Sequence, residues 1–468
     1  MTEFADKRVV VMGLGRFGGG IGVTRWLHHC GARVTVTDAA DATALESSLA
    51  KIRDLDVTLR LGGHDERDLD ACDLLVASPA VDRRKSDFFR RAVERGIPIS
   101  SEMNLFLERC PARVVGITGS AGKSTTTAMT AAALDAASRA PGWRWGRVWL
   151  GGNIGKSLLD DLTAMRSNDL VILELSSFQL ENAASIHRYP HIALVTNVRE
   201  NHLDRHGTLS DYAAAKANIF VDQKAEDWLL LPDDGGAENL PGVERCVSNV
   251  RRFGADPAKR EAMVPRADAA EDGRDRVALN LTLPGAHNLA NASAALAICR
   301  ILGVDDALAI GALNAFVGLA HRLEFVGDFG GVRVYNDSKA TSPEAAMTSM
   351  RAFDVPVIVL LGGSDKGGSQ TPLGRFVAQH AKAAICYGQT GRAIYDAILD
   401  ASESGELADR PTAHAVVCPS LAEAIHHARA LAEAGDVVLL SPACASYDQF
   451  VNYEQRGETF RELVGNWG

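Results

Sequence analysis

The feature that most constrains the fold is a glycine-rich segment that joins a short apolar run to a helical pattern. Residues 113–118 read as a buried strand, and they lead directly into GSAGKST at residues 119–125. Backbone amides in such a loop can cradle phosphates, while Lys123 can reach the terminal phosphates and the Ser124 hydroxyl can face Mg²⁺. The spacing departs from the standard phosphate-binding loop, because Ile117 occupies the position of its first glycine. We interpret the segment as an ATP site.

A second glycine-rich turn lies near the N-terminus. The sequence GLGRFG at residues 13–18 follows a strand-like run at 8–12 and precedes a helical pattern at 22–30. Asp38 ends the next strand-like run, where a ribose-binding acid would lie in a dinucleotide fold, so the turn by itself indicates NAD or FAD. Any diphosphate could approach the amides of the same turn, so a nucleotide diphosphate sugar is an equally good match. A tight turn without a ligand is the third interpretation.

Strand-like runs alternate with helical patterns over the first hundred residues and again near the end of the chain. This alternation is typical of parallel sheets. At roughly 150 residues per domain, the 468 residues of the chain suggest three domains. We therefore expect an α/β protein with domains at 1–110, 111–320 and 321–468. Segments 232–242 and 267–276 are polar and rich in proline or glycine, and we expect hairpins and loops there.

Composition argues against several classes of protein. Acidic residues outnumber basic ones by 59 to 49 without a dense basic run, so we expect no nucleic-acid partner. No apolar run reaches about 18 residues, and no basic segment followed by an apolar one opens the chain, so we expect a cytoplasmic protein without membrane association. The eight cysteines are scattered without a CxxC pair, which favours reduced core thiols over structural zinc.

Two further segments place carboxylates and a histidine after strand-like runs. Glu174 opens the segment ELSSFQLE at the end of the run 170–175, and His202 lies in ENHLDRH after the run 192–197. Each segment alone would be read as a helix cap or a surface cluster. Together they predict a divalent-metal site beside the expected ATP loop.

Eight ordered blocks resemble the Mur ligases of peptidoglycan synthesis, and they cover nearly the whole chain. The blocks are GITGSAGKSTT (116–126), ELSSFQLE (174–181), ENHLDRH (200–206), YAAAK (212–216), GAHNLAN (285–291), HRLE (321–324), NDSKAT (336–341) and SPACASYDQF (441–450). The last two blocks, with the EQRG sequence at 454–457, most resemble the members of the family that add D-glutamate to UDP-N-acetylmuramoyl-L-alanine.

The resemblance implies a fold and a reaction. The N-terminal domain would be Rossmann-like and bind the UDP-sugar, the central domain would be a P-loop-type ATP-binding domain, and the C-terminal domain would be Rossmann-like and bind the amino acid. The implied reaction is ATP-dependent amide formation, in which the carboxylate of UDP-N-acetylmuramoyl-L-alanine takes the γ-phosphoryl group and the resulting acyl phosphate is displaced by the nitrogen of D-glutamate. Two Mg²⁺ ions and a monomeric enzyme are expected.

The resemblance also assigns roles in catalysis and in ATP binding. The expected catalytic residues are Lys123, Glu174, His202 and Lys216. One Mg²⁺ would lie at Ser124 and Glu174 and a second at His202, while Lys216 would carry a carbamate that orients the metal-bound group. Without the family context, Lys216 reads as a solvated helical lysine. The expected ATP contacts are Gly119, Ser120, Gly122, Lys123, Ser124 and Thr125 at the phosphates, Asn288 and Asn291 at the adenine, and Arg322 and Asp337 from the third domain.

The two other substrates have expected sites of their own. The UDP-sugar residues are Gly15, Arg16, Phe17, Asp38, Ser78 and Asn153. The amino-acid residues are Lys339, Thr341, Lys366, Ser446 and Tyr453. In the last set, lysines and hydroxyls at one sheet edge suit a dicarboxylate, although lysines in loops are otherwise ordinary surface residues.

Three alternatives remain open from the sequence. A different Mur or folylpolyglutamate-type ligase would share the central domain and differ in its amino acid. An NAD-dependent oxidoreductase would use the first glycine-rich turn, but it leaves GSAGKST and NDSKAT without a role. A nucleotide-binding regulator without catalytic activity is the third alternative.

Overall fold

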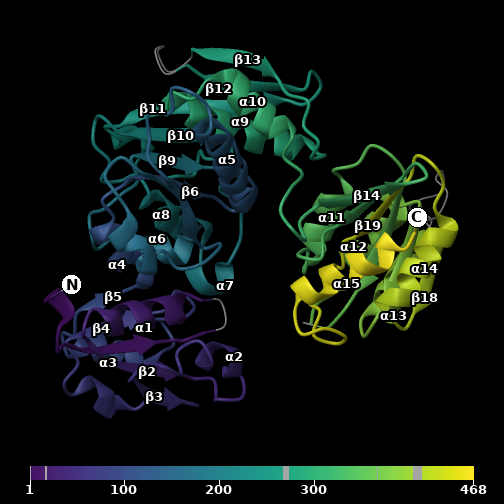
Figure 1. Ribbon diagram of the computed structural model, residues 1–468. Coiled ribbons are helices and arrows are strands. Elements are labelled where there is room, and N and C mark those ends of the chain that lie inside the picture. The colour runs from purple at the N-terminus through teal and green to yellow at the C-terminus, as the bar shows by residue number, and fades with distance from the viewer. Residues whose placement is uncertain (1, 16–17, 267–272, 366, 404–413, 468) are drawn as a thin grey trace. The chain divides into compact units, whose positions relative to one another are not determined.

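The computed structural model describes residues 2–15, 18–266, 273–365, 367–403 and 414–467 (Figure 1). The chain forms two compact units: the first comprises Met1–Leu279 and Ala290–Leu313, and the second comprises Asn280–Leu289 and Asn314–Gly468. The first unit contains two sheets and the second contains one. Each sheet falls within one of the three expected domain ranges, and the domain borders themselves stay predictions.

The N-terminal sheet is wholly parallel. Its strands lie in the order β3 (Thr58–Leu61), β2 (Arg33–Asp38), β1 (Arg8–Met12), β4 (Leu74–Ala77) and β5 (Ile99–Ser100). Its helices are α1 (Gly19–His29), α2 (Glu46–Leu49), α3 (Asp87–Glu94) and α4 (Glu102–Arg109). The strand order reverses on either side of β1, and ligands of open parallel sheets bind beyond the carboxyl ends of the strands at such a reversal. The turn after β1 is therefore in the position that such ligands use.

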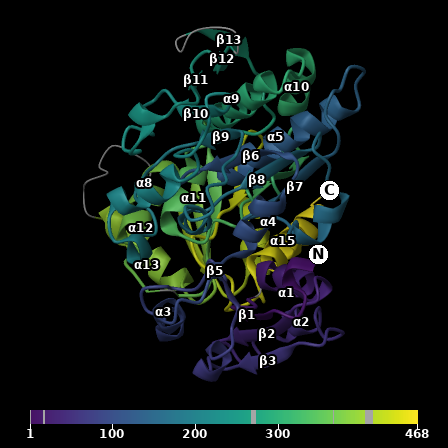
Figure 2. The ribbon, with the colours of Figure 1, turned by 90° about the vertical axis from the view of Figure 1, so that its left-hand side faces the viewer.

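The central sheet has eight strands, parallel from one edge as far as β11. Their order is β13 (Arg274–Ala278), β12 (Glu261–Pro265), β11 (Asn249–Asp256), β10 (Trp228–Pro232), β9 (Ile192–Val195), β6 (Arg113–Thr118), β8 (Leu170–Glu174) and β7 (Val148–Gly152). β11, β12 and β13 pair in antiparallel fashion; β13 begins within the expected segment 267–276, of which residues 267–272 lie outside the described residues. Helix α9 lies beside β12, because the Ser293 hydroxyl donates to the carbonyl of Met263 at 3.0 Å (Figure 2).

The helices of the central range and the short 3₁₀ helices belong to the first unit, except that residues 286–289 of α9 and Asn314 of α10 fall in the second. The helices are α5 (Lys123–Ser138), α6 (Ser177–Ala183), α7 (Leu203–His206), α8 (Leu209–Ala217), α9 (Ala286–Ile301) and α10 (Asp306–Asn314). The 3₁₀ helices are η1 (Thr2–Phe4), η2 (Glu66–Leu69), η3 (Leu159–Ala164) and η4 (Val243–Arg245). A single apolar cluster includes Leu27 of α1, Phe106 of α4, Leu159 of η3 and Leu173 of β8. This shared core explains why two sheets form one compact unit.

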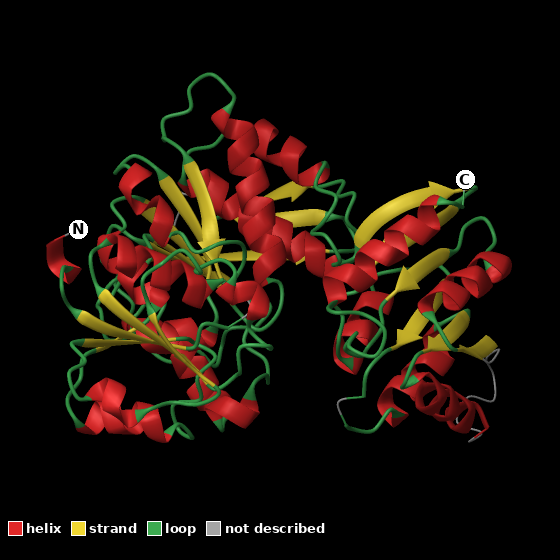
Figure 3. Cartoon of the chain, turned by 60° about the horizontal axis from the view of Figure 1, so that its bottom comes forward, coloured by secondary structure: helices red, strands yellow, loops and turns green. Residues whose placement is uncertain are grey.

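The second unit is built on a six-stranded sheet. Its strand order is β14 (Glu324–Phe329), β15 (Val332–Asn336), β19 (Val437–Leu440), β16 (Val357–Gly362), β17 (Ala383–Tyr387) and β18 (His414–Cys418). Its helices are α11 (Pro343–Met350), α12 (Thr371–His380), α13 (Gly391–Glu403), α14 (Leu421–Leu431) and α15 (Tyr453–Gly465). All neighbours are parallel except the β14–β15 hairpin, and helices flank the strands (Figure 3). The predicted α/β class is confirmed.

The apolar runs in the sequence locate most of the strands. The observed bounds of β1 and β6 equal the predicted runs 8–12 and 113–118, and Asp38 ends β2 as expected. The eight cysteines are all free thiols, five of them buried, as expected. Within the described ranges, no helix has the length and apolar character needed to cross a membrane.

Candidate active site

The loop between β6 and α5 needs glycine at two positions. Gly119 and Gly122 have positive φ values of 147° and 85°. A Cβ atom would lie 1.8 Å from the Thr196 Oγ1 atom at Gly119, and 2.5 Å from the Asn291 Oδ1 atom at Gly122. Only glycine fits both the backbone conformation and these close neighbours. Helix α5 begins directly after Gly122, so the first amides of the helix can donate hydrogen bonds to an anion bound at the loop.

Two polar residues after β9 support this loop. The Thr196 hydroxyl donates to the carbonyl of Ala121 at 2.6 Å, and the Asn197 side chain both donates to that carbonyl and accepts from the Ala121 amide at 3.0 Å. Neither residue belongs to a motif that predicts the site from the sequence. The available signal was that two polar residues directly follow a buried strand, and β9 lies next to β6 in the sheet.

Lysines from two helices converge on one carbonyl of the loop. Lys123 of α5 and Lys216 of α8 each place the Nζ atom 2.9 Å from the Gly119 carbonyl oxygen. Lys216 is 1% exposed, so the interpretation of a solvated helical lysine is wrong. Burial, with a smaller contribution from Lys123, lowers the pKa of Lys216 to about 6. An unmodified Lys216 is therefore mostly uncharged at neutral pH.

Glu174 ends β8 beside the same loop. Its side chain is 1% exposed, and its Oε1 atom accepts a hydrogen bond from the Asn153 side chain at 2.9 Å. The other oxygen, Oε2, is buried without a hydrogen-bond partner among the described residues. A buried carboxylate oxygen without a donor is costly, and a bound cation would satisfy it. The residues present therefore fit a divalent metal at Glu174, with the Ser124 hydroxyl of the neighbouring loop as a second oxygen.

The two histidines of ENHLDRH have different surroundings. His202 precedes α7 with a left-handed φ of 54°, is exposed, and its ring centre lies 5.2 Å from that of Phe178. His206 is buried and lies 2.9 Å from the Ser177 hydroxyl, and its ring stacks on that of Phe178 with 5.1 Å between the ring centres. Burial lowers the pKa of His206. His202 is thus the histidine that a ligand can reach.

Protein side chains alone do not enclose a metal here. No group of three His, Cys, Asp or Glu residues is arranged to hold an ion within the part of the chain that the structure describes. Mg²⁺ usually retains water and phosphate ligands rather than a complete protein cage. A site of this kind would be completed by the oxygens of a bound nucleotide.

The first glycine-rich turn borders a pocket of about 640 Å³. Gly15, Asp38 and Ser78, three of the predicted UDP-sugar residues, all line it. The Asp38 carboxylate accepts from the Gly15 amide at 3.0 Å and from the Ala40 amide at 2.9 Å, so this acid orders the turn. Asn153 instead contacts Glu174, and Arg16 and Phe17 lie outside the described residues.

Two aromatic residues that the sequence motifs do not predict also line this pocket. His64 and Phe88 line it, and their ring centres are 5.1 Å apart. His64 follows two glycines in LGGHDERD at residues 61–68, and Phe88 lies in the charged segment RRKSDFFRR at residues 83–91, but neither segment matches one of the motifs described above.

The second unit gathers predicted amino-acid residues at one sheet edge. Strands β15 and β19 are parallel neighbours, with Asn336 opposite Leu440, so the loops that follow them leave from the same edge. Lys339, after β15, places its Nζ atom 5.8 Å from the ring centre of Tyr453, after β19. Thr341 and Ser446 lie in the same two loops, Ser446 being buried, while Lys366 lies outside the described residues.

Three predicted nucleotide residues of the second unit have contacts within that unit. Asp337 accepts from the Ser441 hydroxyl at 2.8 Å and from the Leu323 amide at 3.1 Å, and burial raises its pKa to about 6. Arg322 lies close enough to act on that carboxylate electrostatically. The Asn288 side chain donates to the carbonyl of Pro284 at 2.6 Å. Their roles toward ATP stay predictions.

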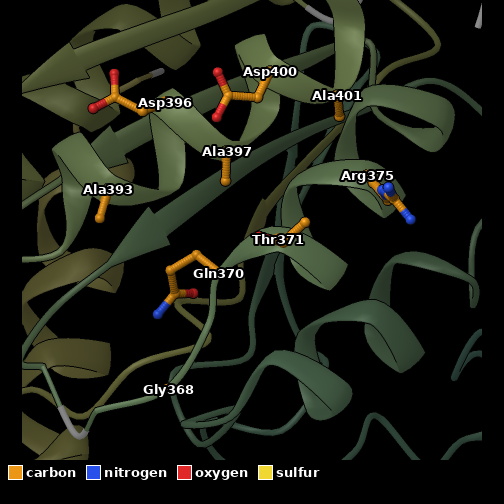
Figure 4. A pocket seen from close by; sticks show the side chains of 9 residues that line it. All are labelled: Gly368, Gln370, Thr371, Arg375, Ala393, Asp396, Ala397, Asp400 and Ala401. Carbon is orange, nitrogen blue, oxygen red and sulfur yellow. The ribbon is translucent and has the colours of Figure 1, made fainter. Parts of the chain in front are cut away.

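A pocket of about 340 Å³ lies between α12 and α13 (Figure 4). Arg375 lines it from α12, and Asp396 and Asp400 line it from α13. It contains none of the predicted site residues, and no motif in the sequence points to it.

Comparison with known proteins matches all three sheet regions to one family. Residues 7–101 match the Mur ligase MurD-like N-terminal domain, 117–299 the Mur ligase middle domain, and 321–444 the Mur ligase glutamate ligase domain. The UDP-N-acetylmuramoylalanine–D-glutamate ligase of Symbiobacterium thermophilum is 38% identical over 98% of both chains. That of Pelotomaculum thermopropionicum is 36% identical, over 99% of this chain and 98% of the relative.

Solved structures show the same fold at lower identity. The UDP-N-acetylmuramate–alanine ligase MurC of Thermotoga maritima has a TM-score of 0.58 at 21% identity, covering 98% of this chain and 100% of that one. MurF of Acinetobacter baumannii has a TM-score of 0.55 at 15% identity, covering 99% and 92%. The chain belongs to the Mur ligase family, in the branch that includes the D-glutamate ligases.

Proposed function

We propose that this chain joins D-glutamate to UDP-N-acetylmuramoyl-L-alanine in an ATP-dependent reaction of peptidoglycan precursor synthesis. One observation carries the proposal. Lys123, Lys216 and Glu174 meet at the glycine-rich loop in a chain that matches D-glutamate ligases over nearly its whole length.

The chemistry divides into two displacements. The carboxylate oxygen of the L-alanyl group attacks the γ-phosphorus of ATP, and the bond from that phosphorus to ADP breaks. The uncharged amine of D-glutamate then attacks the acyl carbon, inorganic phosphate leaves, and the nitrogen loses a proton. The Lys123 ammonium and the loop amides stabilise the negative charge that develops on the transferring phosphoryl group. The loop of residues 119–125 thus serves the first displacement.

Divalent metal fits the acidic side of this site. Ser124 and Glu174 would hold one Mg²⁺, and His202 with a modified Lys216 would hold a second. Bound Mg²⁺ neutralises phosphate charge and aligns the phosphoryl group for in-line transfer. The Oε2 atom of Glu174, which has no hydrogen-bond partner among the described residues, supports the first of these positions.

Lys216 is proposed to carry a carbamate. Its buried amine lies beside the Gly119 carbonyl and over the Tyr212 ring, 4.4 Å from the ring centre, away from bulk water. The uncharged Nζ atom would attack the carbon of CO₂, form an N–C bond as one C–O π bond opens, and release a proton, which turns a neutral amine into an anion. A ¹³C NMR spectrum recorded with labelled bicarbonate would show a carbamate carbon that is missing in Lys216→Ala. A spectrum without that signal, at saturating bicarbonate and Mg²⁺, contradicts the modification.

D-Glutamate would bind in the second unit. Lys339 and Lys366 would meet its carboxylates, Thr341 and Ser446 would donate hydrogen bonds, and Tyr453 would form one wall. The UDP-sugar would bind at the first glycine-rich turn through Gly15, Arg16, Phe17, Asp38 and Ser78, with Asn153 toward the muramoyl side. We further propose a cytoplasmic monomer, which light scattering after gel filtration would test.

Phosphate release with a panel of amino acids tests the function. Purified protein, ATP and Mg²⁺ are mixed with UDP-N-acetylmuramoyl-L-alanine and each amino acid in both chiral forms. We expect release only with D-glutamate. Release with L-lysine or meso-diaminopimelate, whose distal ammonium the two lysines would repel, indicates a different Mur-type ligase. Nicotinamide reduction without ATP turnover would restore the oxidoreductase alternative.

A further inference from the structure

One arginine connects the wall of the UDP-sugar pocket to the segment that carries His202. Arg205 lies on α7, and its guanidinium donates to three consecutive carbonyls of the loop after β4. The distances are 3.3 Å to Pro79, 3.3 Å to Ala80 and 3.0 Å to Val81. Three carbonyls on one guanidinium fix the position of that loop, because the donors of arginine form a planar fork.

The loop that Arg205 holds belongs to the pocket. Ala80 and Val81 line the pocket of about 640 Å³ together with Ser78 and Asp82. Ser78 is also joined to this loop, since the Ala80 amide donates to its hydroxyl at 3.3 Å. A ligand that presses on this wall therefore acts on atoms that Arg205 holds.

The other side of Arg205 faces the aromatic neighbour of His202. Its guanidinium carbon lies 4.2 Å from the ring centre of Phe178, within the range of a cation–π interaction. The same ring contacts that of His202 at 5.2 Å and stacks against that of His206. A continuous set of contacts thus runs from the pocket wall through Arg205 and Phe178 to His202.

We infer that Arg205 is a positioning residue that couples occupation of the UDP-sugar pocket to the placement of His202. The inference rests on the proposed function for the identity of the two ligands. It predicts that the nucleotide sugar and the magnesium nucleotide bind with positive coupling, and that the coupling passes through this side chain. If Arg205 only supported folding, its replacement would leave unchanged the ratio between the affinity for the UDP-sugar with the magnesium nucleotide and the affinity without it.

The experiment compares Arg205→Gln, Arg205→Lys and the control Arg90→Gln. Arg90 forms ion pairs only with Asp87 and Glu94 of its own helix among the contacts that the structure describes. Calorimetry measures the Kd of UDP-N-acetylmuramoyl-L-alanine with and without Mg²⁺ and a non-hydrolysable ATP analogue. In Arg205→Gln the loop loses a charged donor, so we expect the Kd of the UDP-sugar measured with the analogue to rise about ten-fold or more. The ratio of the Kd without the analogue to the Kd with it should then approach one.

Arg205→Lys keeps the charge but spans fewer carbonyls, so its ratio should lie between those of wild type and Arg205→Gln. This variant decides the question if Arg205→Gln does not fold. An unchanged ratio in both folded variants, or a wild type without coupling, overturns the inference. Absence of D-glutamate-dependent phosphate release in the wild type overturns the proposed function instead, and the binding measurement distinguishes the two failures.

Discussion

The two glycine-rich loops of the first unit share a local form and differ in their surroundings. Each follows a parallel strand and ends at a left-handed glycine before a helix, Gly18 with φ 95° and Gly122 with φ 85°. The second loop is surrounded by two lysines, the buried Glu174 and Asn291. At the first loop the Gly15 amide is held by Asp38, beside an open pocket.

The difference between the two loops distinguishes phosphate binding from phosphoryl transfer. A turn with exposed amides before a helix can hold a phosphate in either place. Breaking a phosphoryl bond also needs cations and metal-binding oxygens directed at the transferred group. Two lysines donate to a carbonyl of the second loop, and Glu174 ends the strand next to β6, so we expect changes there to lower kcat and changes at the first loop to raise KM.

Removal of the Lys123 ammonium should have the largest effect. Lys123→Ala should lower kcat by about 1,000-fold or more, because the transferring phosphoryl group loses its nearest cation. The KM for the UDP-sugar should change little. Lys156→Ala, which removes an exposed lysine paired with Asp161, is the matched control. Near-normal turnover of Lys123→Ala would show that this loop does not carry out the reaction.

Loss of Lys216 should be almost as severe and should be partly reversible. We expect Lys216→Ala to be nearly inactive, because the site loses the anion that the proposed carbamate would supply. Added acetate or formate should restore measurable phosphate release by occupying the vacated space, and should have no such effect on Lys123→Ala. Wild-type activity in Lys216→Ala would remove this residue from the mechanism.

A methyl group at the first loop should affect binding alone. Gly13 has φ 94°, and a Cβ there would lie 2.8 Å from the Ser78 Cβ. Gly13→Ala should therefore raise the KM for the UDP-sugar by about ten-fold, the effect of roughly 1.4 kcal/mol, and leave kcat close to normal. Gly311→Ala, where a Cβ would meet nothing within 4 Å, controls for the substitution itself. A fall in kcat without a change in KM would contradict the division between the loops.

The smallest effect concerns stability and pH. The folded-state pKa of Lys216 is lowered to about 6 from 10.5, so between these values the unfolded chain holds a proton that the folded chain lacks. Stability should therefore rise with pH across this window. In CO₂-free buffer without ligands, the melting temperature of wild type relative to Lys216→Met should increase from pH 6 toward pH 9. A difference that stays constant would contradict an uncharged buried amine.

The sequence predicts the strands and the charged members of the site for physical reasons. Runs such as residues 113–118 are continuous and apolar because both faces of a parallel strand are buried. Lys123, Ser124 and Glu174 lie in short motifs at strand ends, where the sheet fixes their direction. The apolar runs and the short motifs are both local in the sequence, so they can be recognised before the fold is known.

The remaining features depend on contacts between distant segments. Thr196 supports the ATP loop only because β9 lies next to β6, and Arg205 holds residues 79–81 across more than a hundred positions of sequence. His64 and Phe88 line the same pocket because the order of the N-terminal strands brings their segments together. The shared core that joins the first two sheets also has no local signal. Spatial neighbours of this kind become visible only in the folded structure.

Transfer of labelled oxygen tests the central claim most directly. UDP-N-acetylmuramoyl-L-alanine with ¹⁸O in its carboxylate is converted with D-glutamate and ATP, and the released phosphate is analysed by mass spectrometry. If the loop of residues 119–125 directs the γ-phosphoryl group to that carboxylate, the phosphate carries an oxygen from the labelled carboxylate and the nucleotide product is ADP. Unlabelled phosphate, or AMP with pyrophosphate, would contradict the account.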